Sequence, residues 1–271
     1  MSTQVDGLRR FVGSRPRDGW RPSDVPVVVV VGTAGGVGTS TVAALLAAAT
    51  AQTGRRTLLV DCDEMVGALH RIHNVGIRHG IAALLDPNVA VNDVAVEISS
   101  GCTLLPGGEP PSARRVPFDP TARRTVLRRI AQAYPAYDAV VIDARSQLDG
   151  MLAAAEAGVR RFLVVGGCSP AGIAASYAVL KTAESRWPGI TVDVVFNRHN
   201  ADVAKASFDQ IHHGAQHFLN RSLGFAGTIP NDAEITAAPD QPFHRCASTT
   251  ELAMQQLAAA LFPEVPDAVR V

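Results

Sequence analysis

Glycines and hydroxyl side chains near the start of the chain have the types and spacing to hold a phosphate. Glycine lets phosphate oxygens approach backbone N–H groups closely, and a helix start supplies further unpaired N–H groups. Ser40 would lie where such a loop ligates Mg²⁺ through a hydroxyl. A tight turn without a ligand is the alternative. The loop directly follows the five valines at 27–31, and its residues are Gly35, Gly36, Val37, Gly38, Thr39, Ser40 and Thr41.

Short apolar runs and longer helical patterns alternate along the chain from Pro26 onward. Several of the short runs are uninterrupted and β-branched, as expected for strands that are covered on both faces. Strand–helix alternation predicts an α/β fold with a doubly wound, mostly parallel sheet in a single domain. The predicted strands are 27–31, 57–60, 103–105, 139–142, 162–165, 192–196 and 226–229, and the predicted helices are 40–52, 121–133, 148–157, 171–186, 201–219 and 249–261.

Composition and length limit what else the chain can be. We assign 1–24 to a flexible basic tail, 25–265 to the α/β domain and 266–271 to a short tail. The formal net charge is zero, which gives no indication of nucleic acid or anionic membrane as a partner. No apolar run is long enough to span a bilayer, and the four cysteines form no CxxC. We therefore expect a cytoplasmic protein.

The order of short motifs along the chain resembles that of the MinD/ParA group of P-loop ATPases. The loop of that group reads Lys-Gly-Gly-x-Gly-Lys-[Ser/Thr]-[Ser/Thr], and residues 34–41 read Ala-Gly-Gly-Val-Gly-Thr-Ser-Thr. The resemblance implies a P-loop fold, ATP or ADP with Mg²⁺ as ligand, and a homodimer formed across the P-loop face. Later motifs follow in the family's order, namely Asp-Cys-Asp at 61–63, the strand 137–143 ending in Asp, Asn-Arg at 197–198 and Gly-Thr-Ile-Pro-Asn-Asp at 227–232.

The same resemblance implies roles for residues within and beyond the loop. Ser40, Asp61 and Asp143 would hold or support Mg²⁺, and Asp63 would be the catalytic residue that positions the attacking water. Judged from the residues alone, the three aspartates could instead simply end buried strands or cap helices. Outside the loop, the residues implied to bind nucleotide are Asn197, which would read adenine, Arg198, Pro230 and Asp232.

Both lysines of the family's loop are missing from this chain. Ala34 stands in place of the signature lysine and Thr39 in place of the P-loop lysine, as in the lysine-poor TadZ/CpaE-like branch that positions pilus and secretion machinery. A hydrogen bond to a charged group contributes about 1.5–3 kcal/mol. We therefore expect weak nucleotide binding and weak or absent ATP hydrolysis. Arg145 could supply a compensating charge, although we favour a surface arginine.

The resemblance and the missing lysines together predict a degenerate P-loop protein, a pseudo-ATPase. It would act as a dimerising spatial organiser or assembly factor in partitioning, septum or pole positioning, or a pilus or secretion apparatus. An active ATPase of the same family, with Arg145 and Arg198 replacing the lysines, is one alternative. A short-chain dehydrogenase that binds NAD(P) through the loop at 32–38 is another, since Tyr177 and Lys181 are spaced as Tyr-x-x-x-Lys.

Partners other than a second copy and a protein machine of unknown identity are not favoured. The prolines at 263 and 266 would stop a terminal helix, so we expect no direct membrane anchor there. A basic stretch could bind DNA, but neighbouring acids and the zero net charge favour a solvated or partner-facing helix. Its arginines are Arg114, Arg115, Arg123, Arg124, Arg128 and Arg129.

Overall fold

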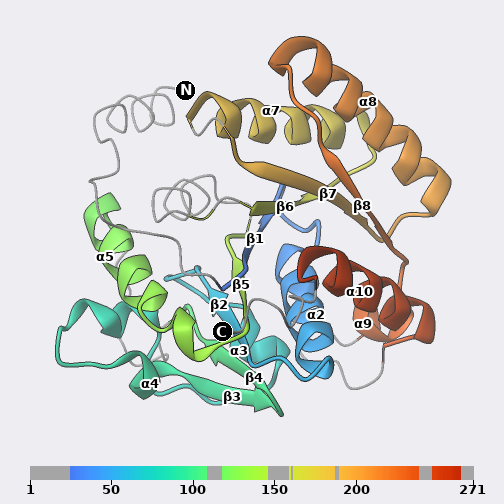
Figure 1. The fold of residues 1–271 in the computed structure, drawn as a ribbon. Helices are drawn as coiled ribbons and strands as arrows, with labels where there is room; N and C mark the ends of the chain where they lie inside the picture. The colour runs from blue at the N-terminus through green and yellow to red at the C-terminus, as the bar shows by residue number, and fades with distance from the viewer. Residues whose placement is uncertain are drawn as a thin grey trace, which may run out of the picture.

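A computed structural model of the chain describes residues 25–108, 118–145, 159, 161–186, 189–237 and 246–263. The predicted tails at 1–24 and 266–271 and the predicted helix at 148–157 lie outside the described residues. The described chain folds around one central sheet with helices on both faces (Figure 1). None of the described helices is long and apolar enough to cross a membrane.

The central sheet has eight strands in the order β3-β4-β2-β5-β1-β6-β7-β8. Neighbouring strands pair in parallel, with the exception of the antiparallel pair of β3 and β4. The predicted doubly wound, mostly parallel sheet is thereby confirmed. The strands are β1 (Val27–Gly32), β2 (Thr57–Asp61), β3 (Val96–Ser99), β4 (Cys102–Leu105), β5 (Ala139–Asp143), β6 (Arg161–Gly166), β7 (Thr191–Asn197) and β8 (Gly224–Ile229).

Strand β3 is absent from the sequence prediction. It is four residues long, and its side chains alternate between half-buried and exposed. It lies at the edge of the sheet, where its register against β4 shifts between Glu97 and Ser99. A short, half-polar edge strand lacks the apolar run by which the buried strands are recognised.

Helices pack on both faces of the sheet. In Figure 1, α2, α9 and α10 lie together on one side, and α7 and α8 lie together on the other. Asp119 caps α5 by accepting hydrogen bonds from the amides of Thr121 and Ala122, each at 2.8 Å. The helices are α2 (Thr39–Gln52), α3 (Leu69–Ile72), α4 (Val91–Val94), α5 (Pro120–Ala131), α7 (Pro170–Arg186), α8 (Ala201–Leu219), α9 (Ala233–Ala237) and α10 (Ser248–Leu261), and the 3₁₀ segments are η2 (Ile81–Leu85) and η3 (Tyr134–Ala136).

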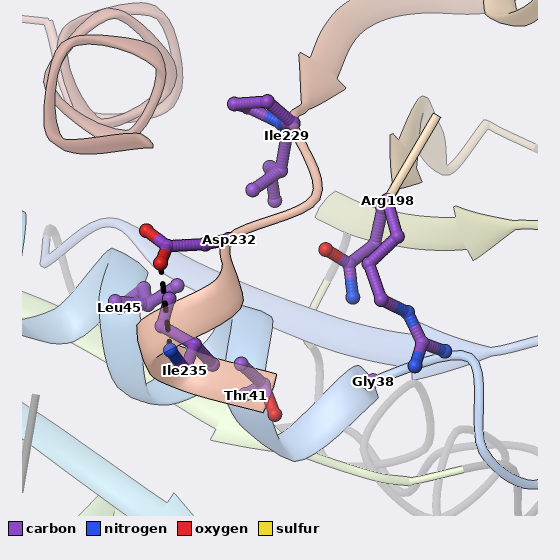
Figure 2. A pocket seen from close by; sticks show the side chains of 9 residues that line it. Gly38, Thr41, Leu45, Arg198, Ile229, Asp232 and Ile235 are labelled. Atoms are coloured by element: carbon purple, nitrogen blue, oxygen red, sulfur yellow. Dashed lines mark hydrogen bonds between the residues drawn. The ribbon is translucent and has the colours of Figure 1, made fainter. Parts of the chain in front are cut away.

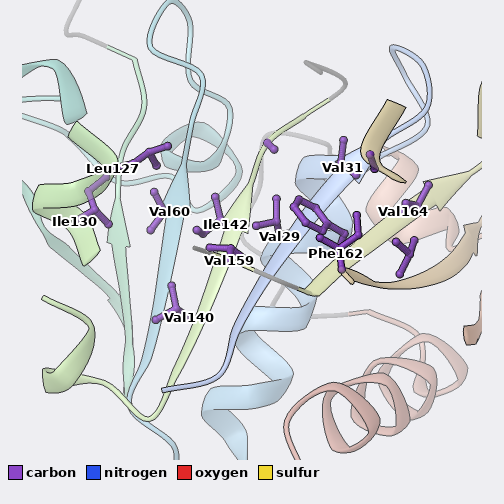
Figure 3. Packing of buried hydrophobic residues seen from close by; sticks show 14 of the residues in the cluster. Val29, Val31, Val60, Leu127, Ile130, Val140, Ile142, Val159, Phe162 and Val164 are labelled. Carbon is purple, nitrogen blue, oxygen red and sulfur yellow. The ribbon is translucent and has the colours of Figure 1, made fainter. Parts of the chain in front are cut away.

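The valine run of β1 is buried on both faces and connects two hydrophobic cores. Val28 and Val30 belong to the core formed with α2 and α10. Val29 and Val31 belong to the opposite core, in which they lie near Phe162 (Figure 3). Full burial of a valine contributes about 1.5–3 kcal/mol. Strand β1 is therefore a rigid base for the glycine loop that follows it.

Candidate functional site

The loop, the aspartates and Asn197 lie together at the carboxyl ends of the strands, because these strands are parallel and end on the same side of the sheet. Asp61 ends β2 and Asp143 ends β5, and the two residues are direct partners in the strand register. The strand order places β5 and β2 on one side of β1, and β7 and β8 on the other. We call Asp61, Asp63 and Asp143 the acidic end of the site. The cavity end comprises Asn197, Arg198, Pro230 and Asp232.

The loop between the two ends exposes backbone N–H groups. Helix α2 begins after Gly38, has no side-chain cap and carries no acid in its first turn. None of the amides of residues 34–38 donates a hydrogen bond to another residue that the structure describes. A Cβ added at Gly35 or Gly36 would meet no atom within 4 Å, so the space in front of them is open. This is the arrangement that binds an anion at a helix start.

Neither replaced lysine position offers a cation to this loop. Ala34 is exposed, and Thr39 is buried. The Thr39 hydroxyl occupies the place that a Cβ on Gly32 would take, so it packs beneath the loop, and any larger residue at position 32 would force Thr39 to move. The Gly32 amide donates to the Arg145 carbonyl at 2.6 Å, which connects the start of the loop to the end of β5.

At the cavity end lies a cavity of about 150 Å³. Six of its lining residues are among those that the sequence implied would bind nucleotide, and Figure 2 shows them with the apolar residues beside them. Leu45, Ile229 and Ile235 were missed, because an apolar side chain in a helix or strand carries no sign of which cavity it will line. The lining residues are Gly38, Thr41, Leu45, Asn197, Arg198, Ile229, Pro230, Asp232 and Ile235.

Asn197 connects the cavity end to the loop through a side-chain hydrogen bond. Its side-chain nitrogen Nδ2 donates to the Val37 carbonyl at 3.0 Å. A carbonyl can only accept, so Oδ1 remains an acceptor for a ligand. Gly38 has φ +92°, and a Cβ there would collide with Asn197 Nδ2. Close approach of Asn197 therefore requires glycine at position 38.

Arg198 and Asp232 are also held by the protein itself. Arg198 has a positive φ of 64°, and its guanidinium donates to the Gly36 carbonyl, extending toward the start of α2 in Figure 2. The Asp232 carboxylate accepts from the amides of Ala247 at 2.7 Å and Glu234 at 3.0 Å. Burial opposes its charge, but these and neighbouring hydrogen bonds lower the pKa of Asp232 overall. Asp232 therefore shapes the cavity rather than offering a free acceptor.

The acidic end contains two fully buried carboxylates. Asp61 accepts three backbone hydrogen bonds, from Asp63 at 3.0 Å, Ala68 at 2.8 Å and Leu69 at 3.1 Å. Burial nevertheless raises its pKa. Burial, and then the charge of Asp61, raise the pKa of Asp143 as well.

Asp143 has an unsatisfied oxygen beside a hydroxyl. Its Oδ1 accepts from the Arg145 amide at 2.9 Å, whereas buried Oδ2 has no well-formed hydrogen bond within the described part of the chain. The nearby Ser40 hydroxyl favours the charged form. Carboxylate and hydroxyl oxygens are ligands that Mg²⁺ prefers, and an ion here would stabilise both charged carboxylates. Asp143 and Ser40 thus fit a magnesium site, which Asp61 supports.

Asp63 is paired with Arg145. Its Oδ1 accepts from the amides of Met65 at 3.1 Å and Val66 at 3.2 Å, while Oδ2 forms an ion pair with Arg145 Nη1. The Asp63 side chain is 3% exposed and that of Arg145 is 40% exposed. Arg145 is thus exposed, as expected of a surface arginine, but it also pairs with the buried Asp63, which the sequence does not show; its backbone has a positive φ of 52°.

Glycines pack tightly beneath the segment that carries Asp61 and Asp63. A Cβ on Gly107 would lie 2.5 Å from the Asp63 carbonyl and 2.8 Å from Asp61 Oδ1. Glu64, next in sequence, pairs with Arg123 of α5 at 2.7 Å and is buried. These supporting residues were not predicted, because their roles depend on loops brought together from distant parts of the chain.

Three other candidates from the sequence, Tyr177, Arg123 and Arg129, make structural contacts. The Tyr177 ring packs edge-on against Phe218 of α8 at 6.4 Å, and neither Tyr177 nor Lys181 lines the cavity. This arrangement gives the dehydrogenase alternative no support. In the basic stretch, Arg123 pairs with Glu64, and Arg129 donates to the carbonyls of Leu84, Asp86 and Val89 at 2.5 Å. Arg114 and Arg115 lie outside the described residues.

Comparison with known proteins agrees with this geometry. Residues 28–242 match the family described as the CobQ/CobB/MinD/ParA nucleotide binding domain. The match spans the loop, both ends of the site and most of the sheet.

Individual relatives are distant in sequence but similar in fold. The antiactivator FleN of Pseudomonas aeruginosa is 24% identical over 216 residues, which are 79% of this chain and 76% of FleN. The septum site-determining protein MinD of Pyrococcus horikoshii, solved with Mg-ADP, has a TM-score of 0.69 at 20% identity, covering 88% of this chain and 96% of that one. MinD in the MinC:MinD complex of Aquifex aeolicus also has a TM-score of 0.69 at 20% identity, covering 89% of this chain and 97% of that one.

Proposed function

Because this chain belongs to the CobQ/CobB/MinD/ParA nucleotide-binding family, we propose that it binds an adenine nucleotide with Mg²⁺ and hydrolyses it weakly or not at all. It would form a dimer across the P-loop face and act as a spatial organiser or assembly factor for a larger machine. FleN is an antiactivator, and the Aquifex MinD was solved with MinC. Both relatives support a role exerted through a protein partner.

One observation carries this proposal: the nucleotide groove keeps its shape while its loop supplies no cation. The cavity, the free amides and the buried aspartates are all present, but Ala34 and Thr39 replace the two lysines. Each lost charged hydrogen bond costs about 1.5–3 kcal/mol, and neighbouring losses need not add. Binding is therefore expected to weaken, and the reacting phosphate to lose most of its electrostatic stabilisation.

Different residues of the groove would bind different parts of the nucleotide. Leu45, Ile229 and Ile235 would enclose the base, and Asn197 Oδ1 would accept from its amino group. The loop amides would bind the first phosphates. Ser40 and Asp143 would hold Mg²⁺, which supplies charge neutralisation when bound. Asp63 would orient a water if hydrolysis occurs.

A second candidate is an ATPase in which arginines replace the lysines. It is favoured by the placement of both candidate arginines at the site, Arg198 on the loop and Arg145 at the acidic end. This candidate differs from the first only in turnover, because both bind nucleotide in the same groove.

The experiment combines calorimetric titration with Mg-ATP, sedimentation with and without nucleotide, and phosphate release. We expect binding in the high-micromolar to millimolar range, nucleotide-dependent dimerisation and phosphate release far slower than in lysine-bearing members. Ser40→Ala should weaken binding in Mg²⁺. Thr125→Ala, which removes a hydroxyl bonded to the Thr121 carbonyl on α5, is the matched control and should leave binding unchanged.

Two outcomes would reject the proposal. Absence of any adenine-nucleotide binding would exclude both candidates. Turnover equal to that of lysine-bearing members, and abolished by Asp63→Ala, would reject weak hydrolysis; its loss on substituting Arg145 or Arg198 would select the arginine-based ATPase.

A further inference from the structure

We propose that Arg145 distinguishes a nucleoside triphosphate from a diphosphate by exchanging Asp63 for the terminal phosphate. This inference rests on the proposed nucleotide binding and adds to it the residue that recognises the last phosphate. It also makes Asp63 dependent on which nucleotide is bound.

The strand order gives the groove a direction. The cavity lies at the ends of β7 and β8, the loop follows β1, and the aspartates lie beyond it at the ends of β5 and β2. A nucleotide with its base in the cavity and its first phosphates on the loop amides must therefore extend its terminal phosphate toward the acidic end. Every added phosphate brings negative charge closer to Asp61, Asp63 and Asp143.

Among described residues, one cation is in direct contact with the acidic end, while Arg71 acts on Asp61 only through its charge. Among the salt bridges of described residues, the one that involves these three aspartates joins Arg145 Nη1 to Asp63 Oδ2. Arg198 lies on the other side of the loop, where it donates to the Gly36 carbonyl. Arg145 is thus the cation placed to meet a terminal phosphate.

The Arg145–Asp63 pair is incompletely bonded. A second Arg–Asp pair joins the amino ends of the same two strands, where Arg56 holds Asp138 through Nε at 3.1 Å and Nη2 at 3.0 Å. Arg145 makes one such contact, through Nη1. A guanidinium that holds its carboxylate by one nitrogen keeps donors for a second acceptor, and phosphate offers more charge and more oxygens than a carboxylate.

The side chain of Arg145 can move while its backbone remains fixed. Its carbonyl accepts from Gly32 at 2.6 Å, and its amide donates to Asp143 Oδ1 at 2.9 Å. The side chain itself is 40% exposed, so it has space to turn. Asp63 cannot follow, because its Oδ1 is held by the amides of Met65 and Val66.

The exchange would have a consequence for Asp63. Its Oδ2 has no other hydrogen-bond partner in the described ranges, so departure of Arg145 leaves a buried oxygen able to accept from a water beside the terminal phosphate. A diphosphate leaves the Arg145–Asp63 pair intact, so Asp63 Oδ2 is not available to a water. Breaking a buried pair has a cost, which keeps the preference for triphosphate small in the unmodified protein.

The test measures dissociation constants of Mg-ATP and Mg-ADP for the full chain and three variants. Arg145→Gln should weaken the binding of Mg-ATP several-fold, because the phosphate contact that is lost was partly offset by the broken Asp63 pair, and should change the binding of Mg-ADP by less than twofold. Asp63→Asn should tighten the binding of Mg-ATP several-fold and leave the dissociation constant of Mg-ADP unchanged. Arg56→Gln removes the pair at the opposite ends of the strands and should change neither constant.

The outcomes separate this role from the proposed function. An unchanged ATP-to-ADP ratio in both variants, or an equal loss of both nucleotides in Arg145→Gln, would overturn the role of Arg145 and leave nucleotide binding standing. Failure of the unmodified protein to bind either nucleotide would overturn both. If Arg145→Gln does not fold, as judged by circular dichroism, Arg145→Lys should lower the ATP-to-ADP preference partially, and an unaltered preference would reject the proposal.

Discussion

The two ends of the groove differ in how completely the protein satisfies its own polar groups. At the cavity end, Asn197 and Asp232 have their hydrogen bonds within the chain. At the acidic end, Asp61 and Asp143 are fully buried carboxylates with raised pKa values, and Asp143 Oδ2 lacks a well-formed partner among described residues. The cavity end keeps one acceptor for a ligand, Asn197 Oδ1, whereas the acidic end keeps a buried carboxylate oxygen, Asp143 Oδ2, without a well-formed partner among described residues.

The largest expected effect comes from Gly38→Ala, which breaks the junction at which Asn197 of the cavity end approaches the loop. The new Cβ collides with Asn197 Nδ2, and φ is +92°, so the loop must shift at a cost of about 1–3 kcal/mol. Mg-ADP affinity should fall at least about tenfold. Calorimetric titration and thermal unfolding would measure both effects.

Gly35→Ala is the matched control for the loss of stability expected in Gly38→Ala. Its Cβ meets nothing within 4 Å and its φ is not in the left-handed region, so stability should be unchanged while phosphate approach is hindered. A Gly38→Ala protein that is as stable and binds as tightly as the unmodified chain would contradict the junction.

The acidic end should make stability fall with rising pH in the absence of divalent ions. Asp61 and Asp143 have raised pKa values, so the folded state binds more protons than the unfolded state between about pH 4 and neutral pH. Their contribution is complete below the unfolded pKa and is lost as pH rises through the folded one, by about 1–3 kcal/mol. Urea unfolding in EDTA at pH 5.5 and 8 would measure it.

Asp143→Asn isolates that contribution from other titrating groups. The variant should lose most of the difference between the two pH values, and Mg²⁺ should restore stability at pH 8 in the unmodified protein alone. The same pH dependence in both proteins would show that these carboxyls are not the cause.

A smaller effect is expected at the cavity end from Asn197→Ala. The Val37 carbonyl loses its side-chain donor, at a cost of about 1 kcal/mol. The affinities for Mg-ATP and Mg-ADP should fall equally, by about fivefold, because the substitution lies away from the terminal phosphate. Asn88→Ala, which removes an exposed amide bonded to Asp86, is the control. An effect on only one nucleotide would contradict the division into two ends.

The sequence predicts what depends on local pattern. The valine run, the glycines and the following helix are adjacent in the chain, so β1, the loop and α2 could be recognised together. Strand ends at Asp61 and Asp143 were also correctly expected. That these two become register partners depends on β5 lying between β2 and β1, which no local pattern encodes.

The bonding of individual side chains was the least predictable feature. Arg145, whose backbone has a positive φ, pairs with Asp63, and Asp232 accepts from the amide of Ala247 across a gap of fifteen residues in sequence. Both contacts are set by tertiary packing. An arginine after one strand and an aspartate in a turn look the same in sequence whether they are solvated or bonded.

The most direct test of the central claim is the affinity of Thr39→Lys for Mg-ATP, with adenosine as the ligand that reports on the cavity end alone. If the loop keeps its shape and lacks only charge, Mg-ATP should bind about tenfold or more tightly to the variant, while adenosine affinity should be unchanged. A folded Thr39→Lys protein with unaltered Mg-ATP affinity would contradict that claim.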